Sequence, residues 1–174
     1  SNIFKSLSHV QNIVEKKNTI PILSNILIEA KNNFIVLSAT DMDISITEKF
    51  NCNVIEEGSV TVSAHTLYDI IRKLPDGNEI EFISNNGKMF SIRSGKSRFS
   101  LGCLPKEEFP IIEIENLNLE FSIDSQIFLK LIEKTRFAIS NEETRYFLNG
   151  IYFHKRSLDN KHCLTMVATD GHRL

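Results

Sequence analysis

Apolar residues recur at two different spacings along this chain, and the two spacings predict its secondary structure. In three segments, residues 1–16, 63–73 and 122–138, apolar residues return every three or four positions, as on one face of an α-helix. Between these segments, alternating or short continuous apolar runs predict strands bounded by turn-forming residues. The expected strands are residues 22–30, 34–39, 42–50, 54–62, 79–84, 88–93, 97–101, 146–154 and 164–169.

The order of these elements predicts the fold class. A helix followed by strands occurs three times in the chain, and most of the strands are joined as antiparallel hairpins. This order is typical of an α+β fold in which the helices gather on one face of the strands. The chain has no glycine-rich turn leading from a strand into a helix, so the sequence excludes Rossmann and P-loop arrangements.

One unit of helix and hairpin is repeated. Residues 37–44 read Leu-Ser-Ala-Thr-Asp-Met-Asp-Ile, and residues 167–174 read Val-Ala-Thr-Asp-Gly-His-Arg-Leu. Upstream, residues 23–28 resemble residues 148–153, and an amphipathic helix precedes each copy. A repeated unit predicts a repeated structure. The later copy changes after Ala-Thr-Asp into Gly-His-Arg-Leu, so a specific role is expected at the end of the chain.

Composition and cysteine usage narrow the class of protein. With 41% hydrophobic and 24% charged residues, the 174-residue chain is typical of a globular protein. It has no long apolar run, so we expect a cytoplasmic protein. Three widely spaced cysteines argue against a disulfide framework, and no second His/Cys pair supports a metal site. Residues 104–119 contain two prolines and several glutamates, which predicts a linker between domains.

Charge is distributed unevenly, although the net charge is only −2. Each helical segment carries a small positive excess, whereas residues 41–60 and residues 100–120 each carry a net charge of −4. A protein that is basic on its helices and acidic elsewhere can face a polyanion with one surface and repel it with the rest.

Four stretches carry a resemblance to a known family: residues 19–27, 94–101, 145–150 and 168–174. In this order they resemble the bacterial DNA polymerase III beta subunit, the sliding clamp. The resemblance covers essentially the whole chain. It implies a DNA-clamp fold, with residues 1–118 as the first clamp domain, residues 119–174 as the first half of the second, and a third domain absent. The chain begins without Met and ends inside a motif, so we expect a piece of a longer protein.

The resemblance also implies a function. Two protomers of such a protein close into a ring around duplex DNA, and the ring tethers polymerases and the clamp loader through short peptides. It is a processivity factor that has no catalysis and no cofactor of its own. Helices line the hole of the ring and contact phosphates without reading bases.

Three groups of residues are the expected sites. The family's peptide-binding pocket matches Leu148, Thr169, Gly171, His172, Arg173 and Leu174. Its dimer-interface strand matches Lys96, Arg98, Phe99 and Leu101. For DNA contact we expect Lys17 together with Lys5, Lys16, Lys130 and Lys134. Two departures weaken the expected DNA contact: Glu142 stands where relatives commonly carry a neutral polar residue, and Ala64-His65-Thr66 opens the second helix where relatives often carry basic residues.

Two other functions fit parts of the pattern. In an enzyme, Asp170, His172 and Arg173 would be catalytic, but the nearest hydroxyl is that of Thr169 and no nucleophile is evident. A non-ring adaptor would bind peptides through the same pocket without contacting DNA. The basic stripes on the helices favour the clamp over this adaptor.

Overall fold

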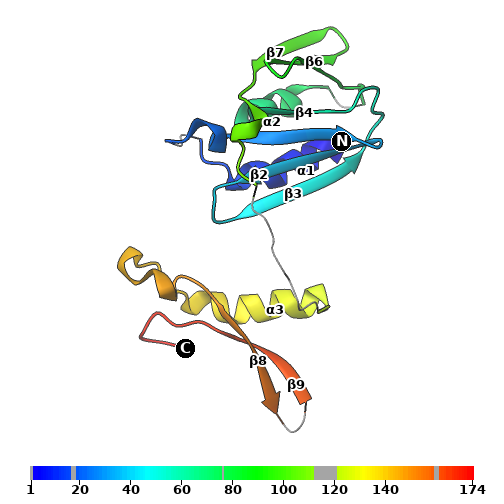
Figure 1. Cartoon of the computed structure of the whole chain (residues 1–174). Coiled ribbons are helices and arrows are strands. Elements are labelled where there is room, and N and C mark those ends of the chain that lie inside the picture. The colour runs from blue at the N-terminus through cyan, green and yellow to red at the C-terminus, as the bar shows by residue number, and fades with distance from the viewer. Residues whose placement is uncertain (1, 17–18, 76, 112–120, 159–160) are drawn as a thin grey trace. The chain divides into compact units, whose positions relative to one another are not determined.

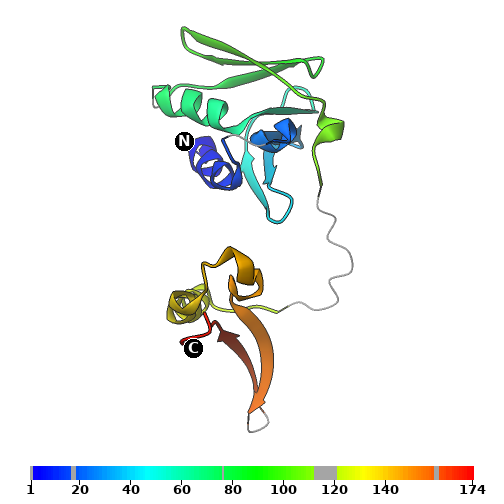
Figure 2. The same ribbon diagram turned by 90° about the vertical axis from the view of Figure 1, so that its left-hand side faces the viewer.

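The computed structural model describes residues 2–16, 19–75, 77–111, 121–158 and 161–174. The chain forms two compact units, Ser1–Ile114 and Glu115–Leu174, which we call unit one and unit two (Figures 1 and 2). The second half of the expected linker, residues 112–119, lies outside the described residues. Among the described residues, no helix is both long and apolar enough to cross a membrane.

A four-stranded antiparallel sheet forms the frame of unit one, in the order β3-β2-β1-β4. Its strands are β1 (Asn25–Lys31), β2 (Phe34–Thr40), β3 (Ser45–Asn51) and β4 (Gly58–Ser63). Asn32 and Asn33 connect β1 to β2 with φ angles of 49° and 62°, as a tight hairpin turn requires.

Two helices cover one face of this sheet (Figure 2): α1 (Asn2–Val10) and α2 (Ala64–Lys73). The core between the helices and the sheet is apolar and includes Leu7, Val10, Ile26, Leu37, Val62 and Leu67. Ser63 caps α2 as predicted, because its hydroxyl accepts a hydrogen bond from the N–H of Thr66 at 3.4 Å. On the opposite face, Leu27 packs with Ile22, Leu23 and Phe109. The predicted α+β class is confirmed.

A smaller antiparallel sheet completes unit one, in the order β5-β6-β7. Its strands are β5 (Glu81–Asn85), β6 (Met89–Ser94) and β7 (Ser97–Gly102). Phe90 and Ile92 of β6 are buried and join the core beneath α2. This leaves β7 at the edge of its sheet, with one side of its backbone not paired to a neighbouring strand of that sheet.

Within its described residues, unit two contains one α-helix and one hairpin. Helix α3 (Ser125–Thr135) is capped by Asp124, whose carboxylate accepts hydrogen bonds from the N–H groups of Gln126 and Ile127 at 2.9 and 3.1 Å. Two 3₁₀ segments follow, η4 (Arg136–Ala138) and η5 (Glu143–Leu148), and then the hairpin of β8 (Tyr152–Leu158) and β9 (Lys161–Val167). Phe128 of α3 packs against Phe153 of β8, with ring centroids 5.7 Å apart.

Several predicted boundaries were wrong. The α-helical part of the first helix ends at Val10. A 3₁₀ turn continues the chain to Ile13, and the backbone of Val14 is extended. The strand expected over residues 22–30 starts at Asn25, because Pro21 opens a short 3₁₀ helix (Pro21–Ser24). The strand expected over 54–62, with an interruption at 56–58, starts only at Gly58. The strand expected over 146–154 starts at Tyr152, because residues before it form η5.

The strand expected over 42–50 starts at Ser45, since residues 40–44 form a closed loop that we call the first Thr-Asp loop. The Thr40 hydroxyl donates to the carbonyl of Ile44 at 2.8 Å and accepts from the N–H of Met42 at 3.0 Å. The Asp41 carboxylate accepts from the N–H groups of Asp43 and Ile44 at 3.0 and 2.7 Å. Met42 takes a φ of 82°, which is rare for a residue with a side chain.

Thr40→Val should destabilise unit one by about 1–3 kcal/mol, because it keeps the side-chain shape but leaves the Met42 N–H without its partner. The Thr40 side chain is almost fully buried, at 1% exposure, so water cannot replace the lost hydroxyl. Chemical denaturation monitored by circular dichroism measures the change. Thr47→Val is the matched control, since Thr47 is exposed and its hydroxyl contacts only Ser38 at 3.4 Å. Equal stabilities of the two variants would contradict this account.

Candidate functional site

The end of the chain forms a second closed loop, residues 169–173, which we call the second Thr-Asp loop. The Thr169 hydroxyl donates to the carbonyl of Arg173 at 2.6 Å and accepts from the N–H of Gly171 at 3.0 Å. The Asp170 carboxylate accepts from the N–H groups of His172 and Arg173 at 2.9 and 3.1 Å. These bonds repeat, position for position, those of the first Thr-Asp loop. The repeat seen in the sequence is therefore also a repeat of hydrogen bonds.

Gly171 occupies the position that Met42 occupies in the first loop, and its φ of 90° is equally positive. A glycine adopts this angle without strain. The missing side chain also leaves room for a neighbour, because a Cβ atom at this position would lie 3.1 Å from Nη1 of Arg145. The guanidinium of Arg145 therefore lies against the backbone of the loop.

Arg145 belongs to η5 and is held there by Glu142. Its Nε donates to Oε2 of Glu142 at 2.7 Å, and its Nη2 makes a further short contact with Oε1 of the same carboxylate. This hydrogen-bonded pairing is the main cause that lowers the pKa of Glu142. Arg145 thus joins η5 to the second Thr-Asp loop. The sequence patterns give Arg145 no role, and its spacing of three residues from Glu142 is the one local signal of this pairing.

Asp170 is the electrostatic centre of the loop. The backbone N–H of His172, followed by the N–H and the guanidinium of Arg173, lowers the pKa of Asp170 from 3.8 to about 2. The Arg173 guanidinium bonds Asp170 through Nε at 2.9 Å and lies 5.8 Å from the ring centroid of Phe137. The loop consequently lies against η4, which follows α3, and the chain terminus lies near this end of α3 in both ribbon views (Figures 1 and 2).

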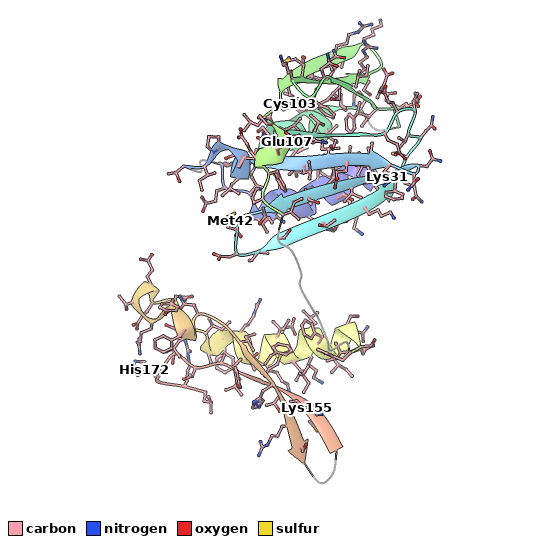
Figure 3. All side chains as sticks on the ribbon, viewed as in Figure 1. Lys31, Met42, Cys103, Glu107, Lys155 and His172 are labelled. Carbon is pink, nitrogen blue, oxygen red and sulfur yellow. The ribbon has the colours of Figure 1, made fainter. Side chains whose placement is uncertain are left out.

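The predicted pocket residues are placed on two neighbouring segments. Leu148 was expected on a strand, and this was wrong: it ends η5, with its carbonyl accepting the N–H of Ser140 at 3.1 Å. His172 is exposed near the end of unit two (Figure 3), and Leu174 is 84% exposed. Tyr146 and Phe147 of η5 are 78% and 71% exposed, with their rings edge to face. Apolar side chains and hydrogen-bond donors thus share one end of unit two.

This arrangement offers no enzyme-like relay. The Asp170 carboxylate binds backbone N–H groups and Arg173, not the imidazole of His172, and the Thr169 hydroxyl donates to a carbonyl. Within the described part of the chain, no group of three or more His, Cys, Asp or Glu side chains could hold a metal ion. The loop can present directed hydrogen-bond donors beside an apolar surface, and this combination suits a peptide ligand.

The predicted interface residues lie on or beside β7. Lys96 precedes the strand and is exposed, as is Arg98, while Leu101 packs against the core of unit one. Phe99 is 39% exposed and lines a shallow groove with residues of α2, including Ile70 and Lys73. The edge strand and this groove form one continuous surface.

The lysines expected to contact DNA are on the surface wherever the structure describes them. Lys5 of α1, Lys16 after the following 3₁₀ turn, and Lys130 and Lys134 of α3 are all exposed. Lys17 lies outside the described residues. Glu142, which we had expected to oppose DNA, is paired with Arg145.

Comparison with known proteins identifies the family. Residues 1–113 match the N-terminal domain of the DNA polymerase III beta subunit, and residues 122–174 match its central domain. The chain belongs to the DNA polymerase III beta subunit family. The resemblance inferred from the sequence is confirmed.

Similar proteins include the beta sliding clamp of Caulobacter vibrioides, 46% identical over 173 residues, which cover 99% of this chain and 46% of that protein. The beta sliding clamp of Rickettsia felis is 40% identical over 172 residues, 99% of this chain and 44% of that protein. This chain spans about half the length of the curated relatives it matches.

Solved structures show the same relationship. Caulobacter crescentus pol III beta superimposes with a TM-score of 0.93 at 45% identity, over 98% of this chain and 47% of that one. A sliding clamp (DNA polymerase III subunit beta) from Bartonella birtlesii bound to griselimycin gives a TM-score of 0.92 at 48% identity, over 98% of this chain and 45% of that one.

The low pKa of Asp170 predicts how this member of the DNA polymerase III beta subunit family responds to acid. A carboxyl whose pKa is lower in the folded than in the unfolded chain stabilises the fold above its unfolded pKa. Its contribution is therefore present above pH 3.8 and disappears as the pH falls towards 2. Carbon-detected NMR titration of the Asp170 carboxyl should give a midpoint near 2. Arg173→Ala should raise this midpoint only partly, because the His172 N–H remains; a midpoint at the ordinary value in the parent chain would contradict the geometry.

Proposed function

We propose that this chain is the first domain, residues 1–118, and the first half of the second domain, residues 119–174, of a DNA polymerase processivity factor. In this proposal the whole protein is a ring-shaped sliding clamp that encircles duplex DNA, has no catalysis or cofactor of its own, and works in the cytoplasm. The observation that carries the proposal is the second Thr-Asp loop, set beside η5 in a chain of the DNA polymerase III beta subunit family.

The second Thr-Asp loop and η5 are suited to hold a short peptide of a polymerase or of the clamp loader. Leu148 and the exposed Leu174 supply apolar contacts, and Gly171 allows a close approach to the backbone. His172 and Arg173 supply donors for peptide carbonyls. Because the loop is closed by its own hydrogen bonds, little ordering is needed when a peptide binds.

Duplex DNA is the proposed ligand of the helices. Lys5, Lys16, Lys130 and Lys134 are exposed on or beside α1 and α3, and lysines attract phosphates independently of base sequence. Pairing of Glu142 with Arg145 reduces the repulsion that a free carboxylate would exert on a phosphate. An adaptor that binds only peptides has no use for exposed lysines on helices of both units.

The first test is titration of a labelled peptide of the Gln-Leu-x-Leu-Phe type into the full-length protein, followed by fluorescence anisotropy. We expect saturable binding that is weakened at least about tenfold in His172→Ala/Leu174→Ala, since the double change removes a donor and an apolar contact. Ile55→Ala is the control, because Ile55 is 91% exposed and lies in unit one. No binding to the parent protein would overturn the proposed docking function.

Ring closure is proposed to use the exposed edge of β7. Phe99→Asp should shift the full-length protein from dimer towards monomer, because it places a charge at the centre of a surface that must become buried. Sedimentation velocity at several protein concentrations measures the shift. Ile55→Asp adds the same charge elsewhere on unit one and should leave the dimer intact. A Phe99→Asp protein that sediments as the parent does would exclude this edge from the interface.

A further inference from the structure

The guanidinium of Arg145 lies between two neighbours, the Glu142 carboxylate and the second Thr-Asp loop. A guanidinium presents five N–H donors in a fixed planar fork, which matches the two oxygens of a carboxylate. In this chain Nε and Nη2 face the Glu142 carboxylate, whereas Nη1 lies beside Gly171 of the second Thr-Asp loop. The edge of the guanidinium that binds carboxylates best is therefore occupied from within the protein.

The pair is accessible to a ligand. The side chains of Arg145 and Glu142 are 35% and 55% exposed, and both belong to or adjoin η5, which lies against the second Thr-Asp loop. Among the smaller effects, the charge of Asp170 raises the pKa of Glu142. A peptide that contacts the loop consequently meets the carboxylate of Glu142 together with the cation that it neutralises.

From these contacts we infer that Glu142 determines the specificity of the docking site by disfavouring peptides with an acidic residue. A peptide carboxylate would have to displace Glu142 from Arg145 or remain close to it, and like charges at that distance repel. A neutral peptide residue has no such competitor. This inference rests on the proposed docking function and names the class of peptide that the site prefers.

Two neighbouring glutamates differ in their contact with Arg145. Glu142 and Glu143 are adjacent glutamates, but only Glu142 bonds Arg145 among the described contacts. Glu143→Gln therefore removes the same charge one residue away without freeing the guanidinium. Glu142→Gln removes the charge and keeps the side-chain size, so that Arg145 becomes available to an incoming carboxylate.

The test compares two labelled peptides, Gln-Leu-Asp-Leu-Phe and Gln-Leu-Asn-Leu-Phe, which differ in charge but hardly in shape. Their affinities for the full-length protein are measured by fluorescence anisotropy, and the ratio of the two Kd values is compared among variants. Glu142→Gln should shift this ratio in favour of the Asp peptide by about fivefold, as expected for a partly exposed ion pair with good geometry. Glu143→Gln should leave the ratio within twofold of the parent.

A double variant decides whether Arg145 carries the effect. Arg145→Gln in the Glu142→Gln background should return the ratio to about its parent value, because the carboxylate then has no guanidinium to bind. An unchanged ratio in Glu142→Gln, or an equal change in Glu143→Gln, would overturn the inference while leaving the docking function intact. Failure of both peptides to bind the parent protein would overturn the docking function and the inference together.

Discussion

The arrangement of this protein depends on hydrogen bonds between threonine or aspartate side-chain oxygens and the backbone that follows a strand. In both Thr-Asp loops the threonine hydroxyl and the aspartate carboxylate satisfy backbone groups that leave the sheet without a partner strand. Their geometry requires a positive φ at the third position, which Met42 tolerates and Gly171 meets freely. The same scaffold thus appears in two units, and the residues placed on it differ.

The difference between the loops explains why only the second is a candidate for docking. In the first loop, Met42 projects a side chain at the point where the backbone could otherwise be approached (Figure 3). In the second, Gly171 leaves that space to the guanidinium of Arg145, which brings η5 beside the loop. Because Gly171 has no side chain, η5 and the second Thr-Asp loop can come into contact although they are distant in sequence. The proposed docking function uses the surface that these two segments form together.

The sequence predicted much of the fold because its signals were local. The alternation along β3 and the cap at Ser63 appear as expected, and the asparagine turns formed where the chain has residues that accept positive φ. It failed where local hydrogen bonds that leave no mark on the apolar pattern shape the backbone. Residues 146–148 are apolar and resemble the start of a strand, but they lie in η5, where Arg145 bonds Glu142. The approach of Arg145 to Gly171 has no periodic signal, so no sequence pattern could have revealed it.

Both arginines of the candidate site are paired with carboxylates three residues away, Arg145 with Glu142 and Arg173 with Asp170. A ligand therefore meets little uncompensated positive charge, although four of its neighbours are ionised. Under the proposed docking function, recognition depends on apolar contact and on the direction of individual donors, so a peptide is distinguished mainly by shape. Under the inference above, substitution of Glu142 changes which ligand charge the site accepts and leaves the bonds of the second Thr-Asp loop in place, whereas substitution of Asp170 would also open that loop. The charge preference of the site can consequently change separately from the fold that positions it.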